Sequence, residues 1–187
     1  MTTPTSPATP GPTTSVPRPR VRRAGPADRD VLERLWLLFR HDLSAVTGEL
    51  PRPDGRFRDE RLRAALDDLG RDDAEVPVWR AHLASLDDRP AAFALVRGLD
   101  APVRVLSAFF VARAARRSGV GLEVAAAVLR DVPGPWEVAF QDANTGAAAF
   151  WPRVAACVAG EDWTLEHRAV PGRPELPPDT WLRLTAA

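Results

Sequence analysis

The sequence FFVARAARRSGVGLEVAAAVL, which runs from Phe109 to Leu129, carries the most information about this chain. An apolar run typical of a β-strand ends in an arginine-rich loop, and Gly119 and Gly121 then open an apolar helix. The first turn of a helix has unpaired N–H groups and the positive end of the helix dipole. Because glycine has no Cβ, a bulky anion can approach the backbone closely. This segment therefore predicts a binding site for a phosphate-bearing ligand.

The residues of the loop narrow the choice of ligand. The chain contains no lysine, which excludes the phosphate loop GxxxxGK[ST], and Val124 stands where the dinucleotide fingerprint GxGxxG requires its third glycine. The remaining pattern, RxxGxG, resembles the acetyl-CoA loop of the GNAT superfamily of N-acetyltransferases. That resemblance implies that backbone N–H groups of the loop bind the pyrophosphate. The loop residues are Arg116, Arg117, Ser118, Gly119, Val120 and Gly121.

A second segment strengthens the resemblance. Residues 136–141 predict a strand, and Asn144, the only asparagine in the chain, follows at a position where its side chain can cap a helix. The pattern NxxAxxF[YW] from Asn144 to Trp151 is similar to the second cofactor segment of the GNAT superfamily. There, two neighbouring strands splay apart and leave a cleft for the pantetheine arm. The resemblance implies that the backbone of Phe110 and Val111 pairs with the pantetheine amides.

Length and composition predict one domain, residues 20–187, behind a disordered tail rich in proline and threonine, residues 1–19. The tail has no apolar segment typical of a secretory signal, and no later apolar run is long enough to span a membrane. Formal net charge is zero, so we expect no general attraction to nucleic acid or to a membrane surface. These features favour a cytoplasmic protein.

Cys157 is the single cysteine, which excludes an intrachain disulfide and a zinc site built from several cysteines. Its neighbours are all apolar, so we expect a buried structural thiol rather than a nucleophile. No metal site is predicted, and acetyl-CoA is expected as a co-substrate.

Periodicity and turn residues predict the order strand, two helices, three strands, helix, strand, helix, two strands. The expected helices are a first one from Pro26 to about residue 47, then 58–69, 119–130 and 144–158. The expected strands are 21–24, 76–86, 91–97, 103–111, 136–141, 163–169 and 180–184. This is the GNAT element order. The resemblance implies a mixed α/β fold of the α+β type, with a mostly antiparallel central sheet, splayed middle strands and about four flanking helices.

The sequence does not identify the general acid or the general base. GNAT enzymes often have a tyrosine that protonates the leaving thiolate, but Trp151 stands at that position and the chain has no tyrosine. An indole cannot serve as the general acid. Family members often place a glutamate on the strand before the loop, where this chain has Ser107 and Ala108.

Two residues are candidates for handling the acceptor. His82, on a predicted central strand, has an intrinsic pKa suited to a base, although a packed core histidine is the alternative. Asp42, near the end of the first helix, borders the acceptor site implied by the resemblance and is a candidate ligand for an amine, or else an ordinary surface charge. His167 is expected on the surface. Pro152 is expected either to kink its helix or to interrupt it.

The resemblance implies an N-acetyltransferase that moves an acetyl group from acetyl-CoA directly to a primary amine. The acceptor is expected to be a small molecule, because no charged docking surface stands out, and the resemblance also implies a possible homodimer. One alternative is a catalytically silent acyl-CoA-binding module, motivated by the missing tyrosine and glutamate. The other is a different phosphate-ligand domain, such as one that binds a nucleotide.

Overall fold

A computed structural model describes residues 18–71, 77–170, 172 and 175–187 of the chain. Its strands are β1 (Arg20–Arg23), β2 (Trp79–Leu86), β3 (Arg89–Arg97), β4 (Arg104–Val111), β5 (Gly134–Phe140), β6 (Trp163–Arg168) and β7 (Asp179–Ala186). Its α-helices are α1 (Arg29–Thr47), α2 (Glu60–Asp67), α3 (Val120–Asp131) and α4 (Thr145–Ala159), with short 3₁₀ turns η1 (Pro26–Asp28) and η2 (Arg113–Ala115). This order is the one that the sequence predicted. The expected tail falls almost wholly outside the described residues, and so does the start of the strand expected at 76.

The strands form one open sheet in the order β1-β2-β3-β4-β5-β7-β6. All neighbours are antiparallel except β4 and β5, which run parallel. A parallel pair needs a crossover connection, and α3 supplies it. The predicted mixed α/β fold with a mostly antiparallel sheet is therefore confirmed.

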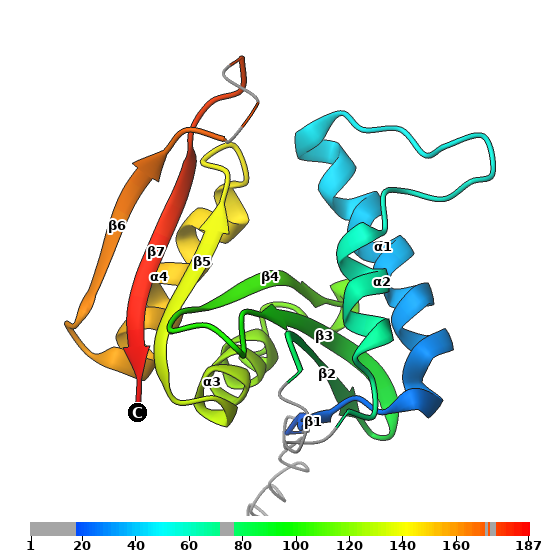
Figure 1. Ribbon diagram of the computed structural model, residues 1–187, viewed down its shortest axis with the longest axis horizontal. Helices are drawn as coiled ribbons and strands as arrows, with labels where there is room; N and C mark the ends of the chain where they lie inside the picture. The colour runs from blue at the N-terminus through cyan, green and yellow to red at the C-terminus, as the bar shows by residue number, and fades with distance from the viewer. Residues whose placement is uncertain (1–17, 72–76, 171, 173–174) are drawn as a thin grey trace, which may run out of the picture.

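Helices cover the sheet in two layers (Figure 1). The pair α1 and α2 packs on β2 and β3 through a core that includes Leu32, Trp36 and Phe93, whereas α3 and α4 pack on the opposite face around Val128, Trp136 and Leu182. Residues 91–96 of β3 are all buried because this strand has helices on both of its faces. No helix among the described residues is both long and apolar enough to cross a membrane.

The sheet splits between β4 and β5. Only three residue pairs join these strands, from Arg104 opposite Trp136 to Leu106 opposite Val138, and the strands then diverge (Figure 1). On its other edge β4 stays paired to β3 as far as Val111, with a register shift that makes Ser107 an extra, bulged residue. A bulge bends its strand and sharpens the local twist, which turns β4 away from β5. The predicted splayed middle strands are therefore present.

Two features of α4 bear on the expectations from the sequence. The helix continues past Pro152, so it is not interrupted there. Cys157 is exposed, and the expectation of a buried thiol is wrong. The apolar residues around Cys157 outnumber the positions of the helix that can be buried. The buried positions of α4 are Trp151, Val154 and Ala155. At about 100° per residue, Cys157 turns toward solvent.

Candidate active site

A cleft of about 590 Å³ lies where β4, α1, α3 and α4 converge. Its lining residues are Phe39, Asp42, Leu43, Val46, Phe109, Phe110, Val111, Arg116, Arg117, Gly119, Gly121, Leu122, Asn144, Gly146, Ala147, Ala149, Phe150, Trp151 and Arg153. They belong to segments that are far apart in the sequence. The two segments singled out from the sequence, the arginine-rich loop and the start of α4, therefore lie on one cleft.

The loop before α3 turns through two left-handed residues. Arg117 has φ 64° and Gly119 has φ 89°, a region that side-chain-bearing residues rarely adopt. A Cβ added at Gly119 would meet nothing within 4 Å, so the space next to this backbone is open. Gly119 is the N-cap of α3 and offers no side chain to the first turn. The helix therefore presents uncapped N–H groups and its positive dipole end at the cleft, an arrangement that suits an anion.

Gly121 lies two residues further along the chain and has a packing role. A Cβ at this position would lie 3.4 Å from the ring of Phe150 and 3.6 Å from a methyl group of Val111. The small residue lets the start of α3 lie close to both α4 and the end of β4. It keeps the cleft narrow between these elements.

The N-terminus of α4 faces the same cleft. The side-chain Oδ1 of Asn144 accepts a hydrogen bond from the N–H of Ala147 at 3.1 Å, which confirms the predicted capping role. Residues 144, 146 and 147 all line the cleft. The positive ends of two helix dipoles therefore lie at one space, which favours a negatively charged ligand.

Asp42 of α1 is bound to this loop by two arginines. Its carboxylate accepts hydrogen bonds from Arg113 Nη2 at 2.8 Å and from Arg116 Nη2, whose Nε also donates to the carbonyl of Val111 at 2.7 Å. Burial alone would raise the pKa of Asp42, but these arginine hydrogen bonds together outweigh burial and lower that pKa. Asp42 thus ties α1 to the arginine-rich loop, and its role as an amine ligand stays a prediction.

Three of the candidate catalytic and cofactor residues do not line the cleft. Ser118 donates its hydroxyl to the carbonyl of Ala115 at 3.0 Å, and the side chain of Val120 is in the core. Both belong to the loop through their backbone. His82 is buried on β2, and its Nε2 hydrogen-bonds Oδ2 of Asp131, at the C-terminal end of α3, at 3.0 Å. The structure therefore places His82 beside the end of α3 that is remote from the cofactor loop.

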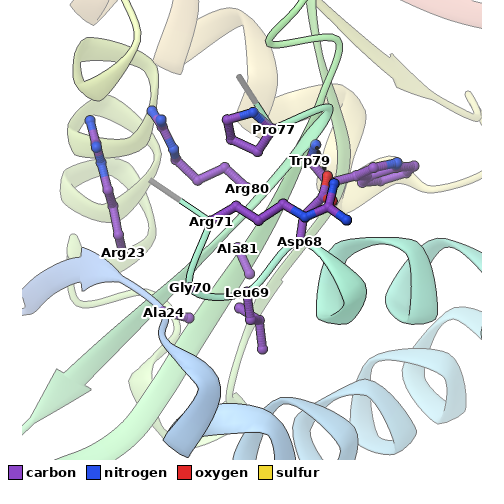
Figure 2. Close-up of a pocket in the computed structure, with 10 residues that line it drawn as sticks. All are labelled: Arg23, Ala24, Asp68, Leu69, Gly70, Arg71, Pro77, Trp79, Arg80 and Ala81. Carbon is purple, nitrogen blue, oxygen red and sulfur yellow. Dashed lines mark hydrogen bonds and ion pairs between the residues drawn. The ribbon is translucent and has the colours of Figure 1, made fainter. Parts of the chain in front are cut away.

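A smaller pocket of about 250 Å³ lies near His82 and Asp131, between β1, β2 and the turn after α2 (Figure 2). Arginines give it a basic lining, but each has an acidic partner: Arg23 and Arg80 approach Asp131, and Arg71 approaches Asp68. None of the predicted cofactor residues lies in it. The positive charges of this pocket are therefore paired with carboxylates of the protein itself.

Aromatic side chains form the wall of the larger cleft beside the diverging strands. The ring of Phe109 stacks on Phe150 with centroids 5.6 Å apart, and Trp151 meets both rings edge-on. Trp151 is only 6% exposed, so the residue at the family's tyrosine position serves here as packing. At the bulge, the hydroxyl of Ser107 is buried and finds no hydrogen-bond partner in the described part of the chain.

The described residues contain no group of three His, Cys, Asp or Glu side chains that could hold a metal ion. His167 is a surface residue of β6, as expected, and its ring approaches Asp142 at 3.0 Å.

Comparison with known proteins agrees with this geometry. A profile of the acetyltransferase (GNAT) family matches residues 34–155, which is more than half of the chain. The chain therefore belongs to the GNAT acetyltransferase family, and the resemblance drawn from its two motifs is confirmed. No curated protein sequence matches it.

Solved structures share the fold at low sequence identity. An acetyltransferase from Thermus thermophilus is 18% identical with a TM-score of 0.58, over 90% of this chain and 97% of that one. A GNAT-family acetyltransferase from Staphylococcus aureus is 13% identical with a TM-score of 0.58, over 89% and 98%. The ribosomal-protein-S18-alanine N-acetyltransferase from Escherichia coli is 9% identical with a TM-score of 0.59, over 90% and 94%. Such likeness shows the fold alone.

Proposed function

We propose that this chain is an N-acetyltransferase that moves the acetyl group of acetyl-CoA directly to the primary amine of a small molecule. One observation carries the proposal: the N-termini of α3 and α4 meet on a single cleft beside the unpaired half of β4. Helix N-termini favour the pyrophosphate, and an unpaired strand edge offers backbone partners to an amide-bearing arm.

The residues present fit such a ligand. The left-handed turn at Arg117 and Gly119 leaves open space beside uncapped N–H groups, where the pyrophosphate is expected. The backbone of Phe110 and Val111, at the end of β4, is expected to pair with the pantetheine arm. The aromatic wall of Phe109, Phe150 and Trp151 would shield the reacting thioester from water.

The reaction needs an uncharged amine. The amine nitrogen forms a bond to the acetyl carbon, the carbon–sulfur bond breaks, and coenzyme A leaves as a thiolate. The proton lost by the amine goes to a base or to solvent. Because Trp151 cannot act as an acid, the thiolate takes a proton from water or from another residue, or leaves unprotonated. Backbone N–H groups of the diverging strand are expected to polarise the thioester carbonyl.

Calorimetric titration with acetyl-CoA tests the proposal. Gly119→Glu introduces a negative charge where the pyrophosphate should lie, and we expect it to weaken binding by about 100-fold or more, because like charges at close range repel strongly. Any side chain at φ 89° is strained, so Gly119→Ala is the matched control that carries the strain without the charge. Equal affinity in both variants would mean that the pyrophosphate does not lie at this loop.

Turnover separates the enzyme from its main alternative. Binding of acetyl-CoA without release of coenzyme A across a broad panel of amines would favour the silent acyl-CoA-binding module, which the absence of a tyrosine still motivates. Competition by ATP at the same affinity would favour a nucleotide-binding domain. A cytoplasmic location and a homodimer are part of the proposal, to be checked by cell fractionation and light scattering.

A further inference from the structure

At the opening between β4 and β5, one face of the sheet is turned toward α1 and α2. Arg61, in the first turn of α2, donates from Nη1 to the carbonyl of Ser107 at 3.1 Å. Ser107 is the bulged residue directly after Leu106, where the pairing of β4 with β5 ends. The guanidinium of Arg61 therefore lies at the point where the sheet opens, on the face opposite α3 and α4.

Arg61 forms no direct ion pair in the part of the chain that the structure describes. The neighbouring Arg40 and Arg58, by contrast, approach Glu49 and Glu60. The side chain of Arg61 is exposed to solvent, but partial desolvation of its guanidinium and the positive charges of nearby arginines, Arg97 first among them, lower the pKa of Arg61. A cation in such surroundings gains most from an anionic partner that arrives with a ligand.

A carboxylate lies on the same face of the sheet, in its far half. Thr180, Leu182 and Leu184 of β7 are buried on the α4 side, so Asp179 lies on the opposite face, because side chains alternate along a strand. Burial raises the pKa of Asp179, and the charge of Arg61 acts on it in the other direction. The charges of Asp179 and Arg61 act on each other, although the two residues form no direct ion pair.

We propose that the acceptor is an amine that also carries a carboxylate, held with its carboxylate at Arg61 and its amino group at Asp179. The amino group arrives as an ammonium and gives up its proton to a base or to solvent before its nitrogen attacks the thioester. This inference rests on the proposed acetyl transfer and names its substrate class. Opposite charges contributed by α2 and β7 match the two ends of such a molecule. The arrangement also brings the amine to the opening between the strands, which the thioester reaches from the other face.

Matched amines test the assignment through the rate of coenzyme A release. We compare kcat/KM for β-alanine with β-alaninamide, and for γ-aminobutyrate with butylamine. The acid of each pair should be preferred by about 10- to 100-fold, the usual value of a charge-assisted hydrogen bond. Arg61→Met should abolish this preference, and Arg61→Lys should keep part of it. Arg63→Met is the matched control, because Arg63 lies on the same helix and already pairs with Asp59.

The readouts keep two failures apart. Acetyl-CoA affinity, measured by calorimetry, should be the same for wild type, Arg61→Met and Arg63→Met, which also shows that the variants fold. If wild type does not bind acetyl-CoA, the proposed function itself fails. If it binds acetyl-CoA but prefers the neutral amines, or if Arg61→Met keeps the preference, this inference is overturned and the acetyltransferase stands. If no amine is acetylated, binding of γ-aminobutyrate to the complex of the protein with coenzyme A is measured by calorimetry. Absence of binding in that titration also overturns the inference.

Discussion

His82 illustrates how one residue type can be interpreted in two ways until its surroundings are known. A histidine with an accessible ring is a good base near neutral pH, whereas this one is 2% exposed and joined to Asp131. It is not among the residues that line the larger cleft. The geometry favours a structural role that links β2 to the end of α3.

We therefore expect His82→Ala to lower the free energy of unfolding by about 2–3 kcal/mol, since it removes a buried ring and a hydrogen bond to a carboxylate. Acetyl-CoA affinity should be unchanged. Urea unfolding and calorimetry measure the two effects, and His167→Ala, on the exposed part of β6, is the control that should change neither. Loss of turnover with intact stability would instead identify His82 as the base.

Among the elements, α4 begins at a residue whose structural role is shown and whose binding role is proposed. Asn144 caps the helix and also lines the cleft. The helix also contains Pro152, which supplies no N–H for the carbonyl of Ala148, so its N-terminal half depends more on the cap. The sequence signal for this element was strong, because a capping residue, an apolar run and a final glycine at position 160 mark both of its ends.

Two substitutions at Asn144 should separate these roles. Asn144→Ala removes the cap and should cost about 1 kcal/mol of stability. Asn144→Asp keeps a capping oxygen and adds a negative charge at the cleft, so stability should be retained while acetyl-CoA binds several-fold more weakly. Thermal unfolding and calorimetry on both variants provide the measurements. Full affinity in Asn144→Asp would place the cofactor phosphates away from α4.

Across the whole molecule, carboxylates bound by cations join separate elements. A hydrogen bond from His82, followed by one from Arg23, lowers the pKa of Asp131, and hydrogen bonds from Arg168 lower the pKa of Glu137. These contacts link α3 to β1 and β2, and β5 to β6. A carboxylate with a lowered pKa in the folded state stabilises the protein above its unfolded pKa. That contribution is lost as the pH falls toward its folded pKa.

Stability should therefore be constant near pH 7 and decrease as the pH falls below about 4, where unfolded carboxylates take up protons first. Asp131→Asn should flatten this decrease, because it removes a carboxylate whose pKa is lowered strongly. Urea unfolding at several pH values gives the slope for each protein. Identical slopes for wild type and Asp131→Asn would show that this carboxylate is not responsible.

The order of the elements and the fold class could be predicted from the chain alone, and so could the two segments that line the larger cleft. These features depend on local patterns: apolar periodicity, glycines at a loop, a capping asparagine, and turn residues between strands. Such patterns act over a few residues, so they can be recognised without knowing what packs against them. The same locality explains the error at Cys157, where an apolar run exceeds the width of the buried face of its helix.

Which distant residues meet could be learned only from the folded molecule. Arg61 and Asp179 are far apart in the chain and belong to no motif, yet in the folded molecule the charge of each acts on the other. The bulge at Ser107 depends on the register between β3 and β4, and His82 and Asp42 took their partners from α3 and from the cofactor loop. Side-chain contacts across a sheet follow from packing rather than from spacing along the chain, so only the tertiary structure decides them.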